Sequence, residues 1–400
     1  MVLPSGHRGN FPPVTAPQKF RAACYTIEGL NSFAVVIYFN YLYFYFRDRF
    51  GFSDKQNLAL AALIGLIYTI ASWQAGRFSH RCGHFNALKI GFGVMAAGLA
   101  AGSQLHSAAG EIATACVVNV GMCFIWPTLE ALVSEGAVAA RAVGLYNITW
   151  AVANASAYFI GGALIQAFGY RIIFYAPLTF MLVQFALTFW LEKIHAVEIP
   201  VDAGKKSLPE PGRPSAARAL NFRRLAWLAN PFAYIGINTL LAVMPGVAAK
   251  FHLTPMLAGF AGSLWCFARF FAFIALWQWT TWHYRFRWLV TAFALLILSF
   301  ATILMAPSLA VVLLAQMIFG VAIGLIYYSS LYYSMDAGGA KSEHGGIHEA
   351  AIGAGNCVGP AVGAVSLQFA AQSANAGAWA VSGLLLVGLG ALLWLRKTAD

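Results

Sequence analysis

Twelve long apolar runs recur along the sequence, from Phe20 to the C-terminus, and they limit what the chain can fold into. About 20 apolar residues are enough to cross the hydrocarbon core of a bilayer as a helix. Hydrophobic residues make up 60% and charged residues 10% of the chain, whereas about a quarter of the residues are charged in a soluble domain. We therefore predict an all-α polytopic membrane protein. Its twelve transmembrane helices are expected over residues 22–46, 57–77, 86–105, 111–134, 142–166, 172–192, 223–249, 255–280, 287–306, 308–335, 347–371 and 374–395.

The basic residues are distributed unevenly over the segments that connect these spans. If both termini are cytoplasmic, nineteen of the 25 Lys and Arg residues lie on the cytoplasmic side and five on the opposite side, with Arg269 inside a span. Cytoplasmic loops carry an excess of Lys and Arg, so we expect a multi-pass protein of the cytoplasmic (inner) membrane with both termini inside. The net charge of +11 has the same origin, and nucleic acid is not an expected partner because no single soluble face collects the basic residues.

The spans fall into two groups of six that are separated by one polar segment. Residues 193–222 contain four prolines and several Lys and Arg residues, which is typical of a flexible linker. We expect a cytoplasmic tail over 1–21, a six-helix bundle over 22–192, the linker over 193–222, a second six-helix bundle over 223–395 and a short cytoplasmic tail over 396–400. The polar, proline-containing start of the chain lacks the pattern of a cleaved signal peptide.

A short segment rich in glycine and basic residues follows the second span, from Trp73 to Lys89. We expect a tight hairpin there, with glycines where backbones approach and cationic residues at the lipid headgroups. A gating role is expected for five of its residues: Gly76, Arg77, His80, Arg81 and Gly83. The spacing of these glycines and Arg81 is similar to the loop signature of the major facilitator superfamily, in which an acid stands where this chain has His80.

The chain resembles the major facilitator superfamily over nearly its whole length. Twelve spans, a basic linker after the sixth span and the Gly/Arg hairpin after the second carry the resemblance, together with Gly355, Gly359, Pro360 and Gly363 in the eleventh span. It departs from many proton-coupled members because no basic residue lies between Glu111 and Arg141. The resemblance implies alternating access of two bundles around a site near the middle of the bilayer.

Arg269 lies well inside the eighth span. An arginine at membrane depth costs several kcal/mol, so it should face a cavity or a partner. Its planar guanidinium suits a carboxylate or phosphate group of a substrate, and we expect it to bind an anionic group. The structural alternatives are an ion pair with Glu349 or a position close enough to the membrane surface for the side chain to extend into water.

Two carboxylates, Glu28 in the first span and Glu130 in the fourth, are candidate proton-coupling residues. Removal from water favours the protonated form of a carboxylate, and a buried acid can therefore link transport to protons. The alternative is that each is an interfacial acid bound to basic residues of the neighbouring loops.

His344, His348 and Glu349 stand at the start of the eleventh span. The two histidines are four residues apart, which puts them on one face of a helix. A zinc-protease helix would need a second histidine that does not follow His348-Glu349, and no fourth metal ligand is visible. We therefore expect no bound metal and no cofactor, and we name His348 and Glu349 as candidates for proton coupling. An ordinary loop followed by a helix start is the structural alternative.

Polar and aromatic residues in the spans that should face a central cavity are candidate substrate contacts. Interhelical hydrogen bonding is the alternative role of the asparagines, and packing that of the aromatic residues. The candidates besides Arg269 are Tyr38, Asn40, Trp126, Asn147, Trp150, Asn154, Asn238, Tyr327, Tyr328 and Asn356.

Together these features predict a secondary active transporter, and not an enzyme, for a small organic solute that is anionic or zwitterionic. The expected partners are that solute, the lipid bilayer and protons, and the chain is expected to act as a monomer. Two alternatives remain open: a multidrug or amphiphile exporter of the same fold, and a membrane-embedded metal-dependent enzyme or sensor that uses His344, His348 and Glu349. The chain has no Gly-x4-Gly-Lys-Ser/Thr loop, which argues against ATP-driven transport.

Overall fold

The computed structural model describes residues 16–134, 139–198, 215–336, 342–370, 372–373 and 375–399. These residues form α-helices and one short 3₁₀ turn, and twelve spans among them are long and apolar enough to cross a membrane. The predicted all-helical, twelve-span fold is therefore confirmed. In chain order the elements are α1 (Ala16–Phe50), α2 (Asp54–Cys82), α3 (His84–Gly102), α4 (Ala108–Cys123), α5 (Trp126–Ser134), α6 (Ala139–Phe168), α7 (Ile172–Glu198), α8 (Ala216–Lys250), α9 (Pro255–Gln278), η1 (Thr280–Trp282), α10 (Phe286–Met305), α11 (Leu309–Asp336), α12 (Ser342–Phe369) and α13 (Ala376–Ala399).

The fourth span is broken into α4 and α5. Pro127 has no backbone N–H, so the helical hydrogen bond to the carbonyl of Cys123 cannot form there. The N–H groups of Phe124 and Ile125 instead donate to the carbonyls of Gly121 and Met122, at 3.2 and 3.0 Å, which makes a tight turn. Because of this break, the span continues from Trp126 as a separate helix, α5.

The boundaries that we predicted for the hairpin after the second span are wrong. Residues 76–82 continue α2, and Gly83, with a φ of +88°, is the single residue between α2 and α3. A helix tolerates basic residues in its last turn because they interact favourably with its dipole, so the polar sequence does not end α2. Arg77 and Arg81 are exposed at this helix end, and the Arg77 guanidinium lies 4.2 Å from the centre of the Trp73 ring. A gating role of this segment remains a prediction.

The expected linker is also partly helical. The helix α7 continues to Glu198 and α8 begins at Ala216, while residues 199–214 lie outside the described part of the chain. The N-cap of α8 is Ser215, whose side chain accepts a hydrogen bond from the N–H of Arg218. Such a cap satisfies one of the free N–H groups at a helix start, and it explains why α8 begins here.

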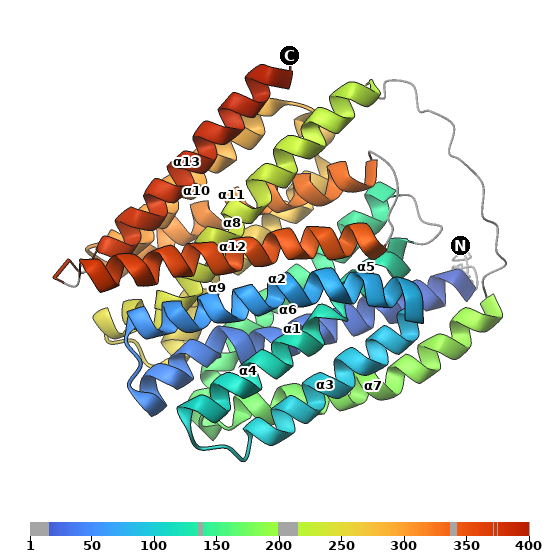
Figure 1. The fold of residues 1–400 in the computed structure, drawn as a ribbon, viewed down its shortest axis with the longest axis horizontal. Coiled ribbons are helices and arrows are strands. Elements are labelled where there is room, and N and C mark those ends of the chain that lie inside the picture. Colours follow the sequence, from blue (N-terminus) through green and yellow to red (C-terminus); the bar gives the residue numbers. More distant parts are fainter. Residues whose placement is uncertain are drawn as a thin grey trace, which may run out of the picture.

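The spans form two sets that lie side by side (Figure 1). In the first set α1 packs on α6 and α7, and α3 packs on α4 and α7; in the second set α11 packs on α9 and α10, and α12 packs on α8. The two sets meet mainly along two helix pairs, α2 with α12 and α6 with α9. This arrangement gives the two predicted six-span bundles and leaves the centre of the molecule between them.

Glycines bring the backbones together at both helix pairs. A Cβ atom on Gly65 of α2 would overlap the backbone of α12 at Asn356, and one on Gly162 of α6 would overlap the carbonyl of Pro255 at the start of α9. Small residues of this kind permit close packing of membrane helices. The contacts between the two halves therefore depend on residues that have no side chain.

We expect Gly162→Ala to lower the melting temperature of the purified protein, because the added methyl group would meet backbone rather than a movable side chain. Overpacking of this kind costs about 1–3 kcal/mol. Gly390→Ala in α13 is the matched control, since nothing lies within 4 Å of a Cβ atom there. Alanine is the better helix former, so this variant should melt at the same temperature or higher. Equal melting of both variants would show that the α6–α9 contact tolerates separation.

Candidate functional site

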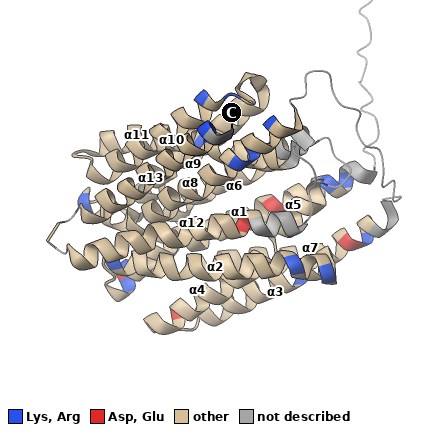
Figure 2. Cartoon of the chain, turned by 45° about the horizontal axis from the view of Figure 1, so that its top comes forward, with Lys and Arg blue, Asp and Glu red and all other residues tan. Residues whose placement is uncertain are grey.

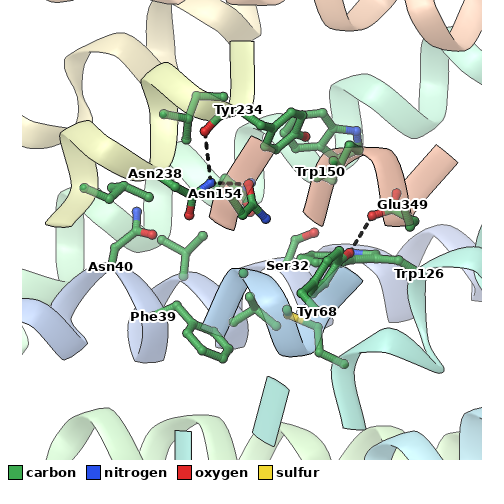
Figure 3. A pocket seen from close by; sticks show the side chains of 18 of the residues that line it. Ser32, Phe39, Asn40, Tyr68, Trp126, Trp150, Asn154, Tyr234, Asn238 and Glu349 are labelled. Atoms are coloured by element: carbon green, nitrogen blue, oxygen red, sulfur yellow. Dashed lines mark hydrogen bonds between the residues drawn. The ribbon is translucent and has the colours of Figure 1, made fainter. Parts of the chain in front are cut away.

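A cavity of about 170 Å³ lies between the two sets of spans. Its walls come from α1, α2, α4, α5 and α6 of the first set and from α8, α9, α11 and α12 of the second. Figure 3 shows side chains from both sets that point into it. Both halves of the chain therefore contribute to the walls of the cavity.

Eleven of the fifteen predicted substrate and proton-coupling residues line this cavity. They are Glu28, Asn40, Trp126, Glu130, Trp150, Asn154, Asn238, Arg269, Tyr327, Glu349 and Asn356.

The other four predicted residues do not line the cavity. The ring of Tyr38 packs against Phe174, with centroids 5.7 Å apart, and Tyr328 packs against Trp282 at 5.8 Å. His348 is buried beside Tyr327, and Asn147 is buried beneath Trp150. Each of these residues lies on a predicted span, but none is among the residues that line the cavity.

Several residues that line the cavity are not among the predicted substrate and proton-coupling residues. They are Ser32, Phe39, Tyr43, Tyr68, Asn119, Tyr146, Tyr234, Trp265 and Cys266, with further apolar residues. Ser32 is four residues after Glu28 and Trp265 is four before Arg269, so helical spacing from residues already named would have found these two. Asn238 is four residues after Tyr234 on α8, so the same spacing would also have found Tyr234. No predicted substrate or proton-coupling residue lies on α2, so this spacing could not have found Tyr68.

Arg269 is 5% exposed and faces the cavity from α9. Its guanidinium carbon lies 4.4 Å from the centre of the Trp150 ring and 4.8 Å from that of Trp265. Among the described residues it forms no ion pair, and its Nε atom has no hydrogen-bond partner. The ion pair with Glu349 is therefore not formed, and cation–π contacts with two indoles hold the charge in place.

Trp150 is held in turn by Asn147, one helical turn earlier on α6. The indole Nε1–H donates to Asn147 Oδ1 at 3.1 Å. The edge of the indole also packs against Tyr327, with ring centroids 5.1 Å apart. Asn147 thus acts on the cavity by orienting the aromatic ring that faces Arg269.

Three carboxylates meet at another part of the cavity wall. Glu28 of α1 is fully buried; its Oε1 accepts hydrogen bonds from Ser32 Oγ at 2.9 Å and from Trp126 Nε1 at 3.2 Å, while its Oε2 has no partner among the described residues. Glu130 of α5 is close enough to Glu28 and Glu349 for their charges to interact. The cluster therefore joins acids from both halves of the chain.

Glu349 of α12 connects this cluster to the helix on the opposite side of the interface. The hydroxyl of Tyr68, on α2, donates to Glu349 Oε2 at 2.5 Å (Figure 3). Within the described part of the chain neither Glu28 nor Glu349 forms an ion pair. The Tyr68–Glu349 bond is thus a polar contact between the two halves, next to the glycine contacts of α2 and α12.

The asparagines of the cavity divide into two kinds. Asn238 of α8 donates to Asn356 Oδ1 of α12 at 2.5 Å, so these two form an interhelical hydrogen bond. The Oδ1 atom of Asn154, in contrast, is buried without a hydrogen-bond partner among the described residues. An unpaired buried acceptor is costly, which makes Asn154 the better candidate for contact with a bound solute.

The metal-site alternative finds no support in the described residues. No group of three His, Cys, Asp or Glu residues among them is arranged to hold a metal ion. The side chain of His344 lies outside the described residues, and that of His348 is buried away from the cavity.

Comparison with known proteins identifies a family and shows a likeness to solved structures. The model of the Major Facilitator Superfamily matches residues 29–360. The crystal structure of the human organic anion transporter MFSD10 (TETRAN) is similar to this chain with a TM-score of 0.66 and 15% sequence identity, covering 96% of this chain and 100% of that chain. No curated protein matches the chain in sequence. At that identity the likeness to MFSD10 shows the fold alone.

We expect Tyr68→Phe to lower the melting temperature of the purified protein, because the substitution removes the hydrogen bond that joins α2 to Glu349 and leaves a buried carboxylate oxygen without this donor. A hydrogen bond to a charged group contributes about 1.5–3 kcal/mol, and one between neutral groups about half of that. Tyr175→Phe is the control, since Tyr175 is 41% exposed on the outer surface of α7. A Tyr68→Phe variant as stable as this control would show that the bond contributes nothing to the contact.

Proposed function

This chain belongs to the major facilitator superfamily, and from that membership we propose that it is a secondary transporter that moves a small organic solute by alternating access of its two halves. The protein is a membrane transporter, and twelve spans in the described part of the chain are long and apolar enough to cross a membrane. The proposal for its mechanism is supported by the position of the cavity, whose walls come from both halves. A change in the contacts of α2 with α12 and of α6 with α9 would open that cavity towards one side of the membrane or the other.

The single observation that carries the substrate class is Arg269. It is a buried cation in the cavity wall with no carboxylate partner among the described residues. A buried charge without a counter-ion is strongly unfavourable, and a guanidinium is suited to two parallel hydrogen bonds with a carboxylate or phosphate. We therefore propose a substrate with an anionic group that binds Arg269. MFSD10 is described as an organic anion transporter, which agrees with this class but does not carry the argument.

Proton coupling is proposed for Glu28, Glu130 and Glu349. Three carboxylates close together in a cavity repel one another unless protons or another cation are bound. They come from α1, α5 and α12, so a change in the relative position of the two halves would change their spacing and hence their proton affinity. Such a change is what coupling requires.

A multidrug or amphiphile exporter is the second candidate. The cavity has aromatic walls, including Trp126, Trp150 and Tyr327, and its carboxylates outnumber its one arginine. These features would suit an amphiphilic cation. In that case Arg269 would have a structural role only.

The orientation in the membrane is proposed from the charges at the helix ends. Figure 2 shows Lys and Arg residues gathered near the ends of the helices. Cytoplasmic segments are expected to carry an excess of Lys and Arg. We therefore propose that both termini lie on the cytoplasmic side of the cytoplasmic membrane. We further propose that one chain is the transporting unit, because a single chain encloses the cavity.

We expect a thermal-shift screen of carboxylates, sugars, sugar phosphates, amino acids and amphiphilic cations to give its largest shifts among the anions, since a ligand of the folded state raises the midpoint with concentration. For an anionic hit, Arg269→Ala should weaken binding about 10–100-fold, the effect of losing hydrogen bonds to a charged group. Arg269→Lys keeps the charge but not the planar fork and should be intermediate. Shifts confined to amphiphilic cations would support the exporter instead.

We expect Glu28→Gln, Glu130→Gln or Glu349→Gln to abolish accumulation of the substrate driven by a pH gradient in proteoliposomes, while exchange of substrate across the membrane continues. A glutamine keeps the shape of the side chain but cannot bind a transferable proton. Glu111→Gln is the matched control, because Glu111 is a buried acid that does not line the cavity and instead accepts a hydrogen bond from Tyr45. Normal accumulation in all three cavity variants would remove these acids from the coupling mechanism.

A further inference from the structure

Groups of opposite charge face the same cavity without neutralising each other. Arg269 enters from α9 with a buried, unpartnered Nε atom, and Glu28 enters from α1 with a buried, unpartnered Oε2 atom. Neither residue forms an ion pair within the described part of the chain. The cavity therefore offers both a free hydrogen-bond donor on a cation and a free acceptor on an acid.

Several aromatic rings line the same cavity as these charged groups. From the Arg269 guanidinium, Trp150 lies at 4.4 Å; from Trp150 the ring of Tyr327 lies at 5.1 Å, and from Tyr327 the ring of Tyr234 lies at 6.2 Å. Tyr234 lines the same cavity as Arg269 and Glu349. A succession of aromatic rings thus extends along the cavity wall from the arginine, and the faces and edges of these rings suit an apolar or aromatic spacer.

The size of the cavity limits the length of that spacer. A volume of about 170 Å³ is somewhat larger than the roughly 150 Å³ of an apolar protein cavity that holds benzene. A single ring with two short substituents, or a short alkyl chain, is of this size. A larger amphiphile would need the cavity to expand.

A solute with one charge would leave one side of this cavity uncompensated. A simple anion would compensate the charge of Arg269 but would add a negative charge near three carboxylates. A simple cation would compensate the carboxylates but would add a positive charge near Arg269. Buried charges are favourable only when they are paired and hydrogen-bonded. A solute with both charges would satisfy the arginine and the acids at once.

We propose that the substrate is a bipolar solute, with a carboxylate or similar anion that binds Arg269 and an ammonium group that binds the Glu28–Glu349 side of the cavity, joined by a short apolar or aromatic spacer. This inference rests on the proposed function and adds the second charge and the spacer. The ammonium donates to Glu28 Oε2, and the aromatic rings between the two ends contact the spacer.

The test compares matched compounds on the purified full-length chain. The aromatic set is 4-(aminomethyl)benzoate with both charges, 4-methylbenzoate with the anion alone and 4-methylbenzylamine with the cation alone. The linear set is ω-amino acids of two to eight carbons, each with the alkanoate and the alkylamine of the same length. Apparent Kd values come from the concentration dependence of the melting temperature.

We expect one or more bipolar compounds to bind at least tenfold more tightly than both of their single-charge partners, because each added charged hydrogen bond contributes about that factor or more. The linear set should show an optimum of chain length. Single-charge compounds that bind as tightly as their bipolar partners in every set, or the absence of any shift with a bipolar compound, would overturn the inference.

Three variants separate this inference from the proposed function. In Glu28→Gln/Glu349→Gln the advantage of the ammonium should disappear while 4-methylbenzoate still binds, which also shows that the variant is folded. In Arg269→Gln the advantage of the carboxylate should disappear. Glu111→Gln should change neither preference.

Failure of the bipolar-solute inference and failure of the proposed anion site would give different binding results. If 4-methylbenzoate binds as well as 4-(aminomethyl)benzoate, and Arg269→Gln abolishes both, the bipolar inference fails and the proposed anion site stands. If Arg269→Gln leaves the apparent Kd of every compound unchanged, the proposed anion site itself fails.

Discussion

The close contact of two helix pairs is the constraint on which the rest of the molecule depends. Where α2 meets α12 and α6 meets α9, the backbones approach so closely that a methyl group on Gly65 or Gly162 would overlap the partner helix. Membrane helices gain little from the hydrophobic effect when they associate, since lipid tails are as apolar as leucine. Packing of this kind therefore provides much of the attraction between the two halves, and it does so without covering the centre of the interface.

The cavity that remains is unusual in the charges it contains. A guanidinium that lies over two indoles and a group of carboxylates hydrogen-bonded to Ser32, Trp126 and Tyr68 share one small volume. In a low-dielectric surrounding each such charge is costly unless it is compensated. That cost is acceptable in a transporter because the solute and protons supply the compensation when they bind, and the differential affinity of the two states for them is what shifts the conformational equilibrium.

The Tyr68–Glu349 hydrogen bond connects these two features. It crosses the α2–α12 contact and ends on a carboxylate of the cavity. Any change in the charge of Glu349 therefore acts directly on a contact between the halves. A buried polar group at such a position strongly affects the stability of the contact. In a low dielectric its hydrogen bond is strong when it is formed, and the unpaired group is costly in free energy when it is not.

The membrane fold, the number of spans and the charged residues that need a cavity could all be predicted from the sequence. Hydropathy is a property of each segment alone, and the residue type by itself shows that Arg269 or Glu28 would be costly if it faced lipid. The helix ends were less predictable. The basic residues Arg77 and Arg81 indicated a loop, but they lie in the last turns of α2. Which face of each helix lines the cavity depends instead on how the helices pack against one another. Asn147 and Asn154 share one helical stripe, yet Asn147 lies beneath Trp150 while Asn154 lines the cavity. Tyr68 and Glu349 are 281 residues apart and meet because of how α2 packs on α12. The rotation of each helix about its axis is set by the side chains of its neighbours, which no local pattern contains.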